Sequence, residues 1–424
     1  MPTKVVIGLQ WGDEGKGKVV DQLVHDWANV VVRYQGGPNA GHTIYNEEGK
    51  KFVTHALPSG VLKNECKNII AKGCVINPIS LHKEIKEFRA TPEMLRISDM
   101  SPLILPHHVM IDKLKYQTKI GTTAKGIGPA YADYISRDNK IMLELCNCLD
   151  DVKNYSYNQL RKIAEFDVYS KDYFKSVFEK YAIENGFEVN VESENYIKDF
   201  MYNQYFPVLE ELSEFYSDYI EDTDLLLQQY YNENRNIILE GAQGWGLDVW
   251  GRSYPNVTSS SPNIGGVLTY TGLNHKQIDE VIGVVKLYKS KVGSGSFRTE
   301  WVECDRTDEI RKALGEYGAT TGRPRRLGWL DLDEVKSACQ TNGIDSIVFT
   351  RVDSVALLDE FKFKLGNNIY EIDKWSINDP DDMQEDELIQ RDIIYFVNLV
   401  KTNLGLKNIH LSYGKRRNQL KWNM

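Results

Sequence analysis

The residues best suited to chemistry lie near the start of the chain, in the stretch VVIGLQWGDEGKGKVVD from Val5 to Asp21. Its first apolar run predicts a buried strand, a glycine-rich loop follows, and apolar residues at helical spacing come next. Strand, glycine loop and helix together present free backbone N–H groups and a positive helix end to a phosphate. Such a cradle has no use for an acid, here Asp13, unless the acid holds a metal ion or moves a proton. We therefore predict a catalytic loop.

The spacing from Gly12 to Lys18 nearly satisfies the Walker A phosphate-loop pattern, but Val19 stands where Ser or Thr would hold Mg²⁺. The alternative is an ordinary first strand and turn whose charges face water. Glycine and charge packed this densely after a strand favour phosphate binding.

Two further glycine-rich loops offer polar side chains. The first, YQGGPNAGHT from Tyr34 to Thr43, contains His42. A lone histidine is more often structural than catalytic, but the flanking glycines let a ligand come close to this imidazole. The second loop, from Gly121 to Arg137, is equally consistent with an oxyanion or phosphate site and with a plain turn-rich connection.

The C-terminal half contains a group of arginines within a Gly/Thr turn, GATTGRPRRLGWLD, from Gly318 to Asp331. A basic run is usually solvated or binds nucleic acid, whereas arginines in such a turn suit a bidentate grip on carboxylate or phosphate. Further along, a strand-like run from Ser346 ends in Thr-Arg-x-Asp. Its Asp353 can accept hydrogen bonds from guanine N1–H and N2–H₂, or serve as a helix N-cap. We expect a mobile lid from Val292 to Thr299.

Composition excludes several classes of protein. The 424 residues carry a formal net charge of -9, which argues against a general nucleic-acid binder. No apolar run approaches the roughly 18 residues that a membrane span needs, and the N-terminus enters a strand without a signal peptide. Six cysteines in a chain of this length form no disulfide framework, and the Cys146–Cys148 pair has no zinc-site partner. We expect reduced thiols and a cytoplasmic protein.

Strand-like runs that lead into glycine-rich loops recur along the chain, which predicts a mostly parallel sheet with its site at the carboxyl ends of the strands. The runs span residues 5–7, 28–33, 68–78, 103–105, 236–239, 281–288 and 346–353, with one more near 410. A His107–His108 pair follows one run and is interpreted as structural or surface-exposed, because neighbours on a strand face opposite ways.

Between residues 143 and 235 the chain is rich in aromatic and charged residues at helical spacing, and it lacks glycine-rich loops. We predict helical hairpins there. The expected fold class is α/β, a mostly parallel central sheet flanked by helices and similar to P-loop NTPases. We expect one domain, 1–424, with a helical insertion at 143–235.

Taken in order, the loops closely resemble those of the adenylosuccinate synthetase family. The matching stretches are QWGDEGKGK, GGPNAGHT, GTTAKGIGPAY, EGAQG, YPNVTSSSPNIGGV, VGSGSF, GATTGRPRRLGWLD and TRVD, which extend from Gln10 to about Gly414. The resemblance implies a ligase that uses GTP to join IMP and L-aspartate into adenylosuccinate, releasing GDP and phosphate. The reaction would pass through 6-phosphoryl-IMP and be the first committed step from IMP to AMP.

The resemblance also implies roles for single residues, with Asp13 as the base that takes the N1 proton of IMP and His42 as the acid at its 6-oxygen. The implied catalytic residues are Asp13, His42, Lys16 and Gln243. The implied GTP-binding residues are Gly12, Gly15, Lys16, Gly17, Gly41, His42, Thr43, Arg325, Arg351, Asp353, Ser412 and Gly414. Those for IMP are Asp13, Asn39, Thr123, Arg137, Gln243, Thr258 and Arg323, and those for L-aspartate are Val292, Thr320, Thr321, Arg323 and Arg325.

The same resemblance implies a Mg²⁺ ion held by the Asp13 carboxylate and the Gly41 carbonyl. It also implies a homodimer in which Arg137 reaches across the interface. We expect neither nucleic acid nor membrane as a partner.

The sequence departs from the usual family pattern in three places. Arg351 stands where lysine is usual, Ile141 where some members have a second basic residue, and Lys415 and Arg416 where a proline and an acid are common. Two other functions stay open from the residues alone, a GTPase-like switch and an inactive scaffold. Val19 and the arginine turn count against the switch, and the intact pair of Asp13 and His42 counts against the scaffold.

Overall fold

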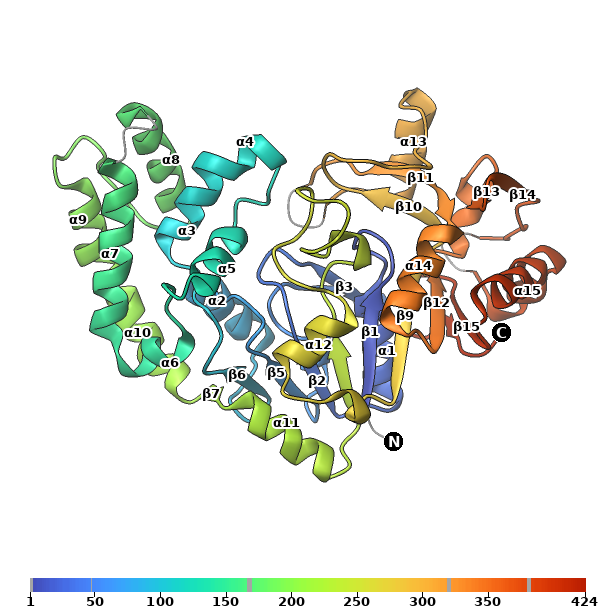
Figure 1. Ribbon diagram of the computed structural model, residues 1–424, viewed down its shortest axis with the longest axis horizontal. Coiled ribbons are helices and arrows are strands. Elements are labelled where there is room, and N and C mark those ends of the chain that lie inside the picture. The colour runs from blue at the N-terminus through green and yellow to red at the C-terminus, as the bar shows by residue number, and fades with distance from the viewer. Residues whose placement is uncertain (1–2, 47, 166–169, 319–321, 380–382) are drawn as a thin grey trace.

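The computed structural model of the chain describes residues 3–46, 48–165, 170–318, 322–379 and 383–424. Its centre is a ten-stranded sheet (Figure 1). The strands, in order across the sheet, are β16 (Leu420–Lys421), β15 (Asn408–Ser412), β12 (Ser346–Thr350), β9 (Glu280–Lys286), β1 (Thr3–Gly8), β8 (Ile237–Glu240), β2 (Val30–Arg33), β5 (Lys67–Ile70), β6 (Leu95–Ser98) and β7 (Ile220–Glu221). Neighbouring strands are parallel except β15 and β16, so the predicted fold class is confirmed.

Two smaller sheets accompany the large one. The first has the order β10 (Tyr288–Lys291), β11 (Arg326–Asp331), β13 (Phe361–Leu365) and β14 (Asn368–Ile372). The second pairs β3 (His42–Tyr45) with β4 (Lys51–Thr54) as an antiparallel hairpin. Because β10 follows β9 almost directly, the chain passes from the large sheet into the first smaller sheet at Leu287.

The helices are α1 (Lys16–Asp26), α2 (Pro78–Phe88), α3 (Pro106–Ile111), α4 (Gln117–Ile120), α5 (Ile127–Ile135), α6 (Met142–Asn147), α7 (Leu149–Glu165), α8 (Lys171–Glu184), α9 (Tyr196–Phe200), α10 (Phe206–Ser217), α11 (Thr223–Asn232), α12 (Ile264–Tyr270), α13 (Asp305–Leu314), α14 (Leu332–Asn342) and α15 (Arg391–Leu404). They flank the sheet, and α7 to α10 stand together at one end of the molecule (Figure 1).

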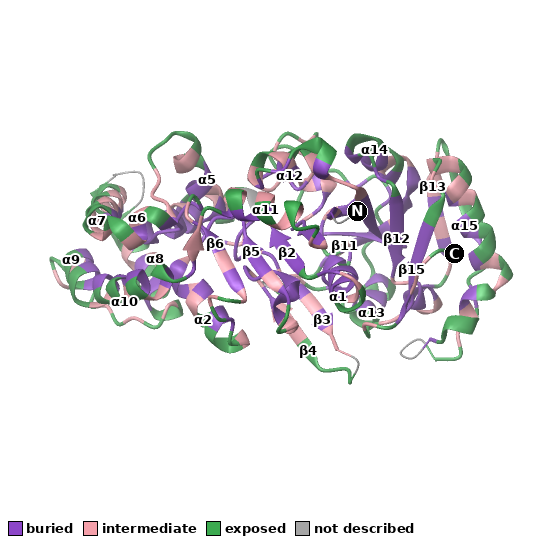
Figure 2. Ribbon diagram, turned by 90° about the horizontal axis from the view of Figure 1, so that it is seen from below, coloured by how far each residue is buried: buried purple, intermediate pink, exposed green. Residues whose placement is uncertain are grey.

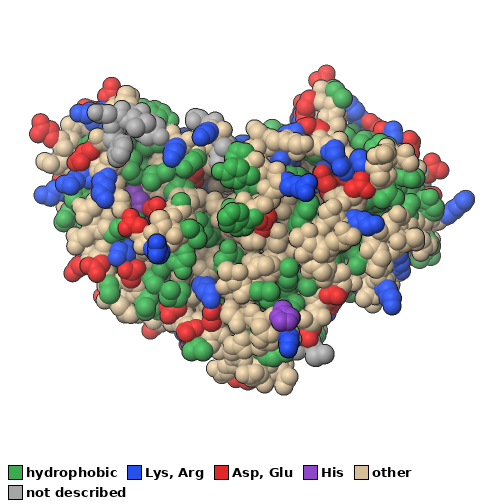
Figure 3. Space-filling model, viewed as in Figure 1, with side chains coloured by type: hydrophobic (Ala, Val, Ile, Leu, Met, Phe, Trp, Pro, Cys, Tyr) green, Lys and Arg blue, Asp and Glu red, His purple; other side chains and the backbone are tan. Residues whose placement is uncertain are grey.

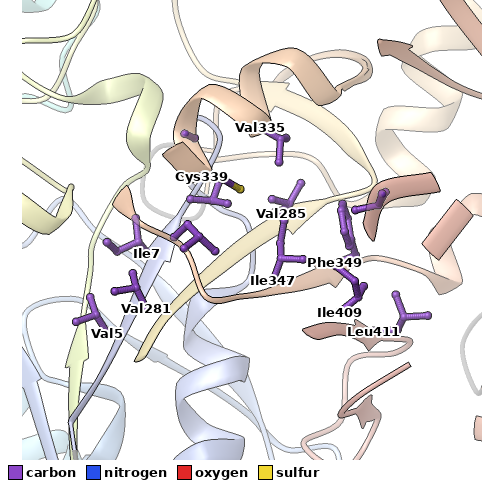
Figure 4. Close-up of a cluster of buried hydrophobic side chains, with 14 of the residues drawn as sticks. Val5, Ile7, Val281, Val285, Val335, Cys339, Ile347, Phe349, Ile409 and Leu411 are labelled. Carbon is purple, nitrogen blue, oxygen red and sulfur yellow. The ribbon is translucent and has the colours of Figure 1, made fainter. Parts of the chain in front are cut away.

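Strand β1 shows how the sheet is covered on both faces. Its side chains alternate, so Val5 and Ile7 join the cluster beneath α14 while Val6 joins the cluster beneath α1. Figure 4 shows Val5 and Ile7 on the side of Val335 of α14. Each fully buried aliphatic side chain of this kind contributes about 1.5–3 kcal/mol, which fixes the register of the strand. Figure 2 shows this buried interior running through the sheet.

The segment 143–235 holds α7 to α11 and also β7, which pairs with β6 at the edge of the sheet. Its aromatic side chains pack around Phe178 and Phe200, whose rings lie 5.1 Å apart, in a core shared with β5, β6, α2 and α3. We retain as a proposal the description of the chain as one domain with a helical insertion at 143–235.

One sequence-based strand prediction is wrong. Residues 103–105 form no strand, only a single bridge from Leu103 to Ile76, because Pro102 and Pro106 flank the run and lack backbone donors. Pro106 instead begins α3, the first position at which a helix tolerates proline. The stretch 68–78 holds a strand and a turn, as predicted, because β5 ends at Ile70 and the chain turns directly after it.

Candidate active site

The phosphate loop connects β1 to α1 with an unusual backbone. Gly12 and Gly15 adopt φ of 89° and 95°, a region open mainly to glycine. Asp13 adopts φ of 59° although it carries a side chain, and that side chain is 37% exposed. Strained non-glycine residues persist where the surroundings hold them and often mark functional sites. The loop therefore presents the carboxylate of Asp13 to solvent.

Glu14, which the sequence did not single out, holds this loop in shape. Its buried Oε1 accepts the backbone N–H groups of Gln10 at 3.2 Å and Gly12 at 2.8 Å, and its Oε2 accepts Lys16 Nζ at 2.6 Å. A Cβ at Gly8 would lie 2.3 Å from Glu14 Oε2, so the chain needs glycine there. The buried carboxylate of Glu14 therefore stabilises the loop and does not face a ligand.

Lys16 ties the phosphate loop to the end of β8. Besides Glu14, its ammonium donates to the carbonyl oxygen of Gln243 at 2.5 Å, and the side chain is only 3% exposed. Gln243 itself adopts φ of 55°, which turns the chain sharply after the strand. The predicted pair Lys16 and Gln243 therefore lies together beside Asp13.

His42, the first residue of β3, packs against the first turn of α1. A Cβ at Gly17 would lie 2.9 Å from the Cβ of His42, so glycine permits this close approach. The imidazole donates from Nδ1 to Oε1 of Glu240, at the end of β8, and Arg33 lies 3.4 Å from the same nitrogen. Burial and Arg33 lower the pKa of His42, against the opposing charge of Glu240.

Glu240 is a second functional residue that sequence reasoning missed, although it begins the EGAQG stretch. Its Oε2 accepts the backbone N–H of Ser59 at 2.8 Å, which orients the carboxylate toward His42. Burial by itself raises the pKa of Glu240, but the charges of His42 and Arg33 outweigh burial and lower it to about 2. An ionised Glu240 keeps the proton of His42 on Nδ1 and leaves Nε2 as the nitrogen that can face a ligand.

The arginine turn reaches the phosphate loop through Arg325. Its Nη2 lies 2.8 Å from Oδ2 of Asp13, and its Nη1 donates to Oε2 of Glu316 at 2.6 Å. Arg323 instead donates to the carbonyl oxygen of Gly121 at 2.8 Å. Thr320 and Thr321 lie outside the residues that the structure describes.

A separate group of residues gathers around Lys18, on the side where guanine is expected. The ammonium of Lys18 donates to the Ser412 hydroxyl at 2.8 Å and to the carbonyl oxygens of Gly414 and Gln419 at 2.6 and 2.7 Å. Burial lowers the pKa of Lys18 to about 7, against the opposing charge of Asp353. Burial likewise raises the pKa of Asp353.

Comparison with known proteins shows the family to which the chain belongs. A family profile described as adenylosuccinate synthetase matches residues 5–395. The chain belongs to this family. The adenylosuccinate synthetases of Halothermothrix orenii and Wolinella succinogenes are 42% and 41% identical over 375 and 372 residues. These matches cover 86% and 85% of this chain and 81% and 80% of those relatives.

Solved structures agree. The fully ligated adenylosuccinate synthetase of Plasmodium falciparum has a TM-score of 0.81 at 27% identity and covers 98% of both chains. A cyanophage S-2L succinoaminodeoxyadenylate synthetase, bound to dGMP and dATP, has a TM-score of 0.61 at 16% identity. It covers 100% of this chain and 95% of that one, a likeness that shows the fold alone.

In this member of the adenylosuccinate synthetase family, the residues predicted from sequence collect at the carboxyl ends of parallel strands. Asp13 and Lys16 follow β1, Asn39 and Gly41 follow β2, and Gln243 follows β8. Arg351, with φ of 65°, and Asp353 follow β12, while Ser412 ends β15 and Gly414 follows it. Thr350 Oγ1 donates to the carbonyl oxygen of Glu14 at 2.6 Å, which joins the β12 end to the phosphate loop.

Other predicted residues lie on loops outside these strand ends. Thr123 follows α4, Thr258 lies in the loop before α12 with its N–H bonded to the Leu247 carbonyl oxygen at 2.8 Å, and Val292 follows β10. Exposed Arg137 follows α5 and adopts φ of 67°. Figure 3 shows the molecule hollowed between the lobe with α4 and the lobe with α13, which the contact of Arg323 with Gly121 connects.

A histidine cluster lies outside this centre. His107 and His108 are both buried on α3, not on a strand as predicted, and lie 3.6 and 3.1 Å from Oδ2 of Asp133. The Nδ1 of His108 accepts the N–H of Leu105 at 2.9 Å, so its Nε2 carries a proton and donates to Asp133. A nitrogen that keeps its proton does not ligate a metal. The cluster anchors α3 to α5.

No described helix combines the length and the apolar character that a membrane crossing requires.

Proposed function

We propose that this chain uses GTP to join IMP and L-aspartate, forming adenylosuccinate, GDP and phosphate through a 6-phosphoryl-IMP intermediate. The observation that supports it most is the placement of two reactive groups around the same loop and helix. Asp13 is exposed within a phosphate loop, and His42 packs on α1, the helix that follows this loop. Membership of the adenylosuccinate synthetase family supports the choice of substrates.

In the first step, the carboxylate of Asp13 removes the N1 proton of IMP, and the 6-oxygen attacks the γ-phosphorus of GTP. The 6-oxygen gains negative charge as the N1 proton leaves. His42 faces this charge with an imidazole whose other nitrogen is bonded to Glu240. Burial and Arg33 lower the pKa of His42, so a positive imidazole depends on ionised Glu240 and on the negative charge that develops on the 6-oxygen.

In the second step, the amine of L-aspartate attacks C6, forms the new C–N bond and expels phosphate with the former 6-oxygen. Phosphorylation makes this oxygen a good leaving group. Arg323 and Arg325 belong to the turn that suits bidentate binding of carboxylates, and Arg325 already contacts Asp13. The turn would therefore place the nucleophile beside the base.

Guanine would lie near Asp353, Ser412 and Gly414. Asp353 is buried and follows β12, and Lys18 fixes the two other residues from α1. A buried carboxylate that pairs with N1–H and N2–H₂ distinguishes guanine from adenine, which offers the opposite pattern there.

A Mg²⁺ ion fits the donors that the resemblance implies. The carboxylate of Asp13 and the carbonyl of Gly41 are oxygen ligands, which this hard cation prefers over nitrogen or sulfur. When bound, Mg²⁺ would offset charge on the phosphoryl oxygens. Lys16 and the backbone N–H groups of the loop would share that task.

The second subunit of a homodimer would complete the IMP site. Arg137 is exposed and follows the end of α5, and an exposed arginine is available to a partner subunit. We also propose a cytoplasmic location.

The decisive measurement is absorbance at 280 nm with IMP, GTP, L-aspartate and Mg²⁺, each omitted in turn. Product that requires all four supports the ligase. Hydrolysis of GTP without IMP would instead indicate a switch and overturn the proposal.

A further inference from the structure

One buried carboxylate, that of Glu316, links the arginine turn to the large sheet. The side chain is 1% exposed. Its Oε1 accepts Lys286 Nζ at 2.9 Å and the Tyr288 hydroxyl at 2.7 Å, and both partners come from the junction of β9 and β10. Its Oε2 accepts Arg325 Nη1 at 2.6 Å. Such charge-assisted hydrogen bonds hold their groups in a defined geometry.

Backbone pairing places Glu316 directly opposite Arg325. The N–H of Arg325 donates to the carbonyl oxygen of Glu316 at 3.0 Å, and the N–H of Gly318 donates to that of Arg323 at 2.8 Å. A bridge between Tyr317 and Pro324 lies between these bonds. The arginine turn is therefore a short antiparallel pair, and Glu316 stands at its base, where its side chain meets that of Arg325.

The guanidinium of Arg325 spans two carboxylates of different character. Glu316 lies inside the protein and has three partners, whereas Asp13 is 37% exposed and contacts Nη2 of Arg325 at 2.8 Å. An incoming carboxylate can reach Asp13's side of the guanidinium but not the side of Glu316. Glu316 is therefore the permanent partner of Arg325, and Asp13 is the exchangeable one.

The groups in direct contact in this cluster are two cations and two anions. Lys286 and Arg325 oppose Glu316 and Asp13, and both cations contact Glu316. When an external carboxylate binds Arg325, Asp13 is released and Glu316 continues to hold the guanidinium. Release is needed, because Nη2 of Arg325 lies 2.8 Å from Oδ2 of Asp13 and so occupies an oxygen that would otherwise face the substrate.

We propose that Glu316 is a positioning residue, which holds Arg325 so that the carboxylate of L-aspartate can replace Asp13 on the guanidinium and free Asp13 for proton transfer. This inference rests on the proposed function. It assigns to Glu316 a role in binding the nucleophile, although Glu316 touches no substrate itself.

The test is the Glu316→Gln variant, which keeps the size of the side chain and removes its charge. We expect kcat to fall and the KM for L-aspartate to rise, each by about tenfold or more, because Arg325 loses its fixed partner. The KM for IMP should stay within about twofold, a selectivity that a general structural defect would not produce.

A double-mutant cycle tests whether Glu316 acts through Arg325. The Glu316→Gln, Arg325→Ala double variant should be no slower than Arg325→Ala alone. Multiplied losses would show that Glu316 acts elsewhere and would overturn the proposal.

Two further variants serve as controls for a folding defect. Glu280 lies at the opposite end of β9 and pairs with Lys4 at 2.9 Å, so Glu280→Gln should leave all kinetic constants unchanged. If Glu316→Gln does not fold, the Glu316→Gln, Lys286→Met double variant removes one charge of each sign and restores the balance. Its KM for L-aspartate should still be raised, and normal kinetics in it would overturn the proposal.

The unsubstituted chain separates this inference from the proposed function. Absence of adenylosuccinate from its reaction would overturn both. Product from the unsubstituted chain together with unchanged kinetics of Glu316→Gln would overturn only the role of Glu316.

Discussion

At the scale of single residues, the site is built from charged groups that hold one another. Asp13 faces Arg325, Lys16 faces Glu14, and His42 faces Glu240, with each contact a short hydrogen bond or ion pair. Only Asp13 among these anions is substantially exposed, which separates the group available for chemistry from those that position it.

Asp13→Asn should lower turnover by about a hundredfold or more while the protein stays folded, because the amide cannot accept the N1 proton. Asparagine tolerates the φ of 59° at this position. Asp13→Ala should abolish turnover equally and cost about 1 kcal/mol more in unfolding free energy. Steady-state kinetics and thermal unfolding measure both effects, and a missing thermal transition in either variant would contradict a catalytic role.

Lys18 should make GTP binding sensitive to pH. Its pKa lies near 7 rather than 10.5, so its ammonium loses its proton as pH rises through neutrality. The neutral amine has two N–H donors for the three acceptors around Ser412, Gly414 and Gln419. The KM for GTP should therefore rise between pH 6.5 and pH 8.5, roughly the range around that pKa.

The matched variant is Lys18→Met, which should show a high KM for GTP that does not change with pH. An equal pH dependence in both proteins would place the titrating group elsewhere.

At the scale of elements, the site depends on close approach between α1 and the start of β3. Gly17 begins the first turn of α1, where alanine would normally stabilise a helix by about 1 kcal/mol. Here its methyl group would meet the Cβ of His42 at 2.9 Å, and β3 would have to move.

Gly17→Ala should lower turnover by about tenfold or more with little loss of stability. Displacement of His42 misplaces a group needed for the reaction but leaves the packing of the hydrophobic core intact. The control is Gly265→Ala in α12, where a Cβ meets no atom within 4 Å among the described residues. That variant should keep full activity. Equal kinetics of the two variants would show that His42 need not hold its place.

At the scale of the whole molecule, the proposed dimer makes a prediction about Arg137. Arg137→Leu should raise the KM for IMP by about tenfold or more and leave the KM for GTP within about twofold, because the guanidinium would serve the partner's IMP site. Because φ at this position is 67°, Arg137→Asn removes the guanidinium with less backbone strain than Arg137→Leu. The two variants should have the same effect on both KM values.

Sedimentation at several protein concentrations should show dimers, and Arg161→Leu on α7, also an exposed arginine, should change neither KM. Equal losses of IMP and GTP binding in the Arg137 variants would indicate a folding defect instead.

The placement of Asp13, Gln243 and Asp353 at one edge of a sheet could be predicted because strand-then-glycine patterns are local. Parallel strands then bring their carboxyl ends together without further information. The partners Glu240 and Glu316 could not be predicted in this way. Glu240 meets His42 across 198 positions of sequence, and a single buried glutamate has no periodic pattern.

The sequence by itself therefore determined the parallel sheet, the phosphate loop and the identity of the exposed acid, since each follows from composition and spacing within a few residues. Only the tertiary structure decided which carboxylates are buried partners and which one faces solvent. It also decided that Arg325 lies between Asp13 and Glu316. These choices depend on contacts between β1, β8, β9 and the arginine turn, and the energies of buried ion pairs are set by geometry rather than by sequence order.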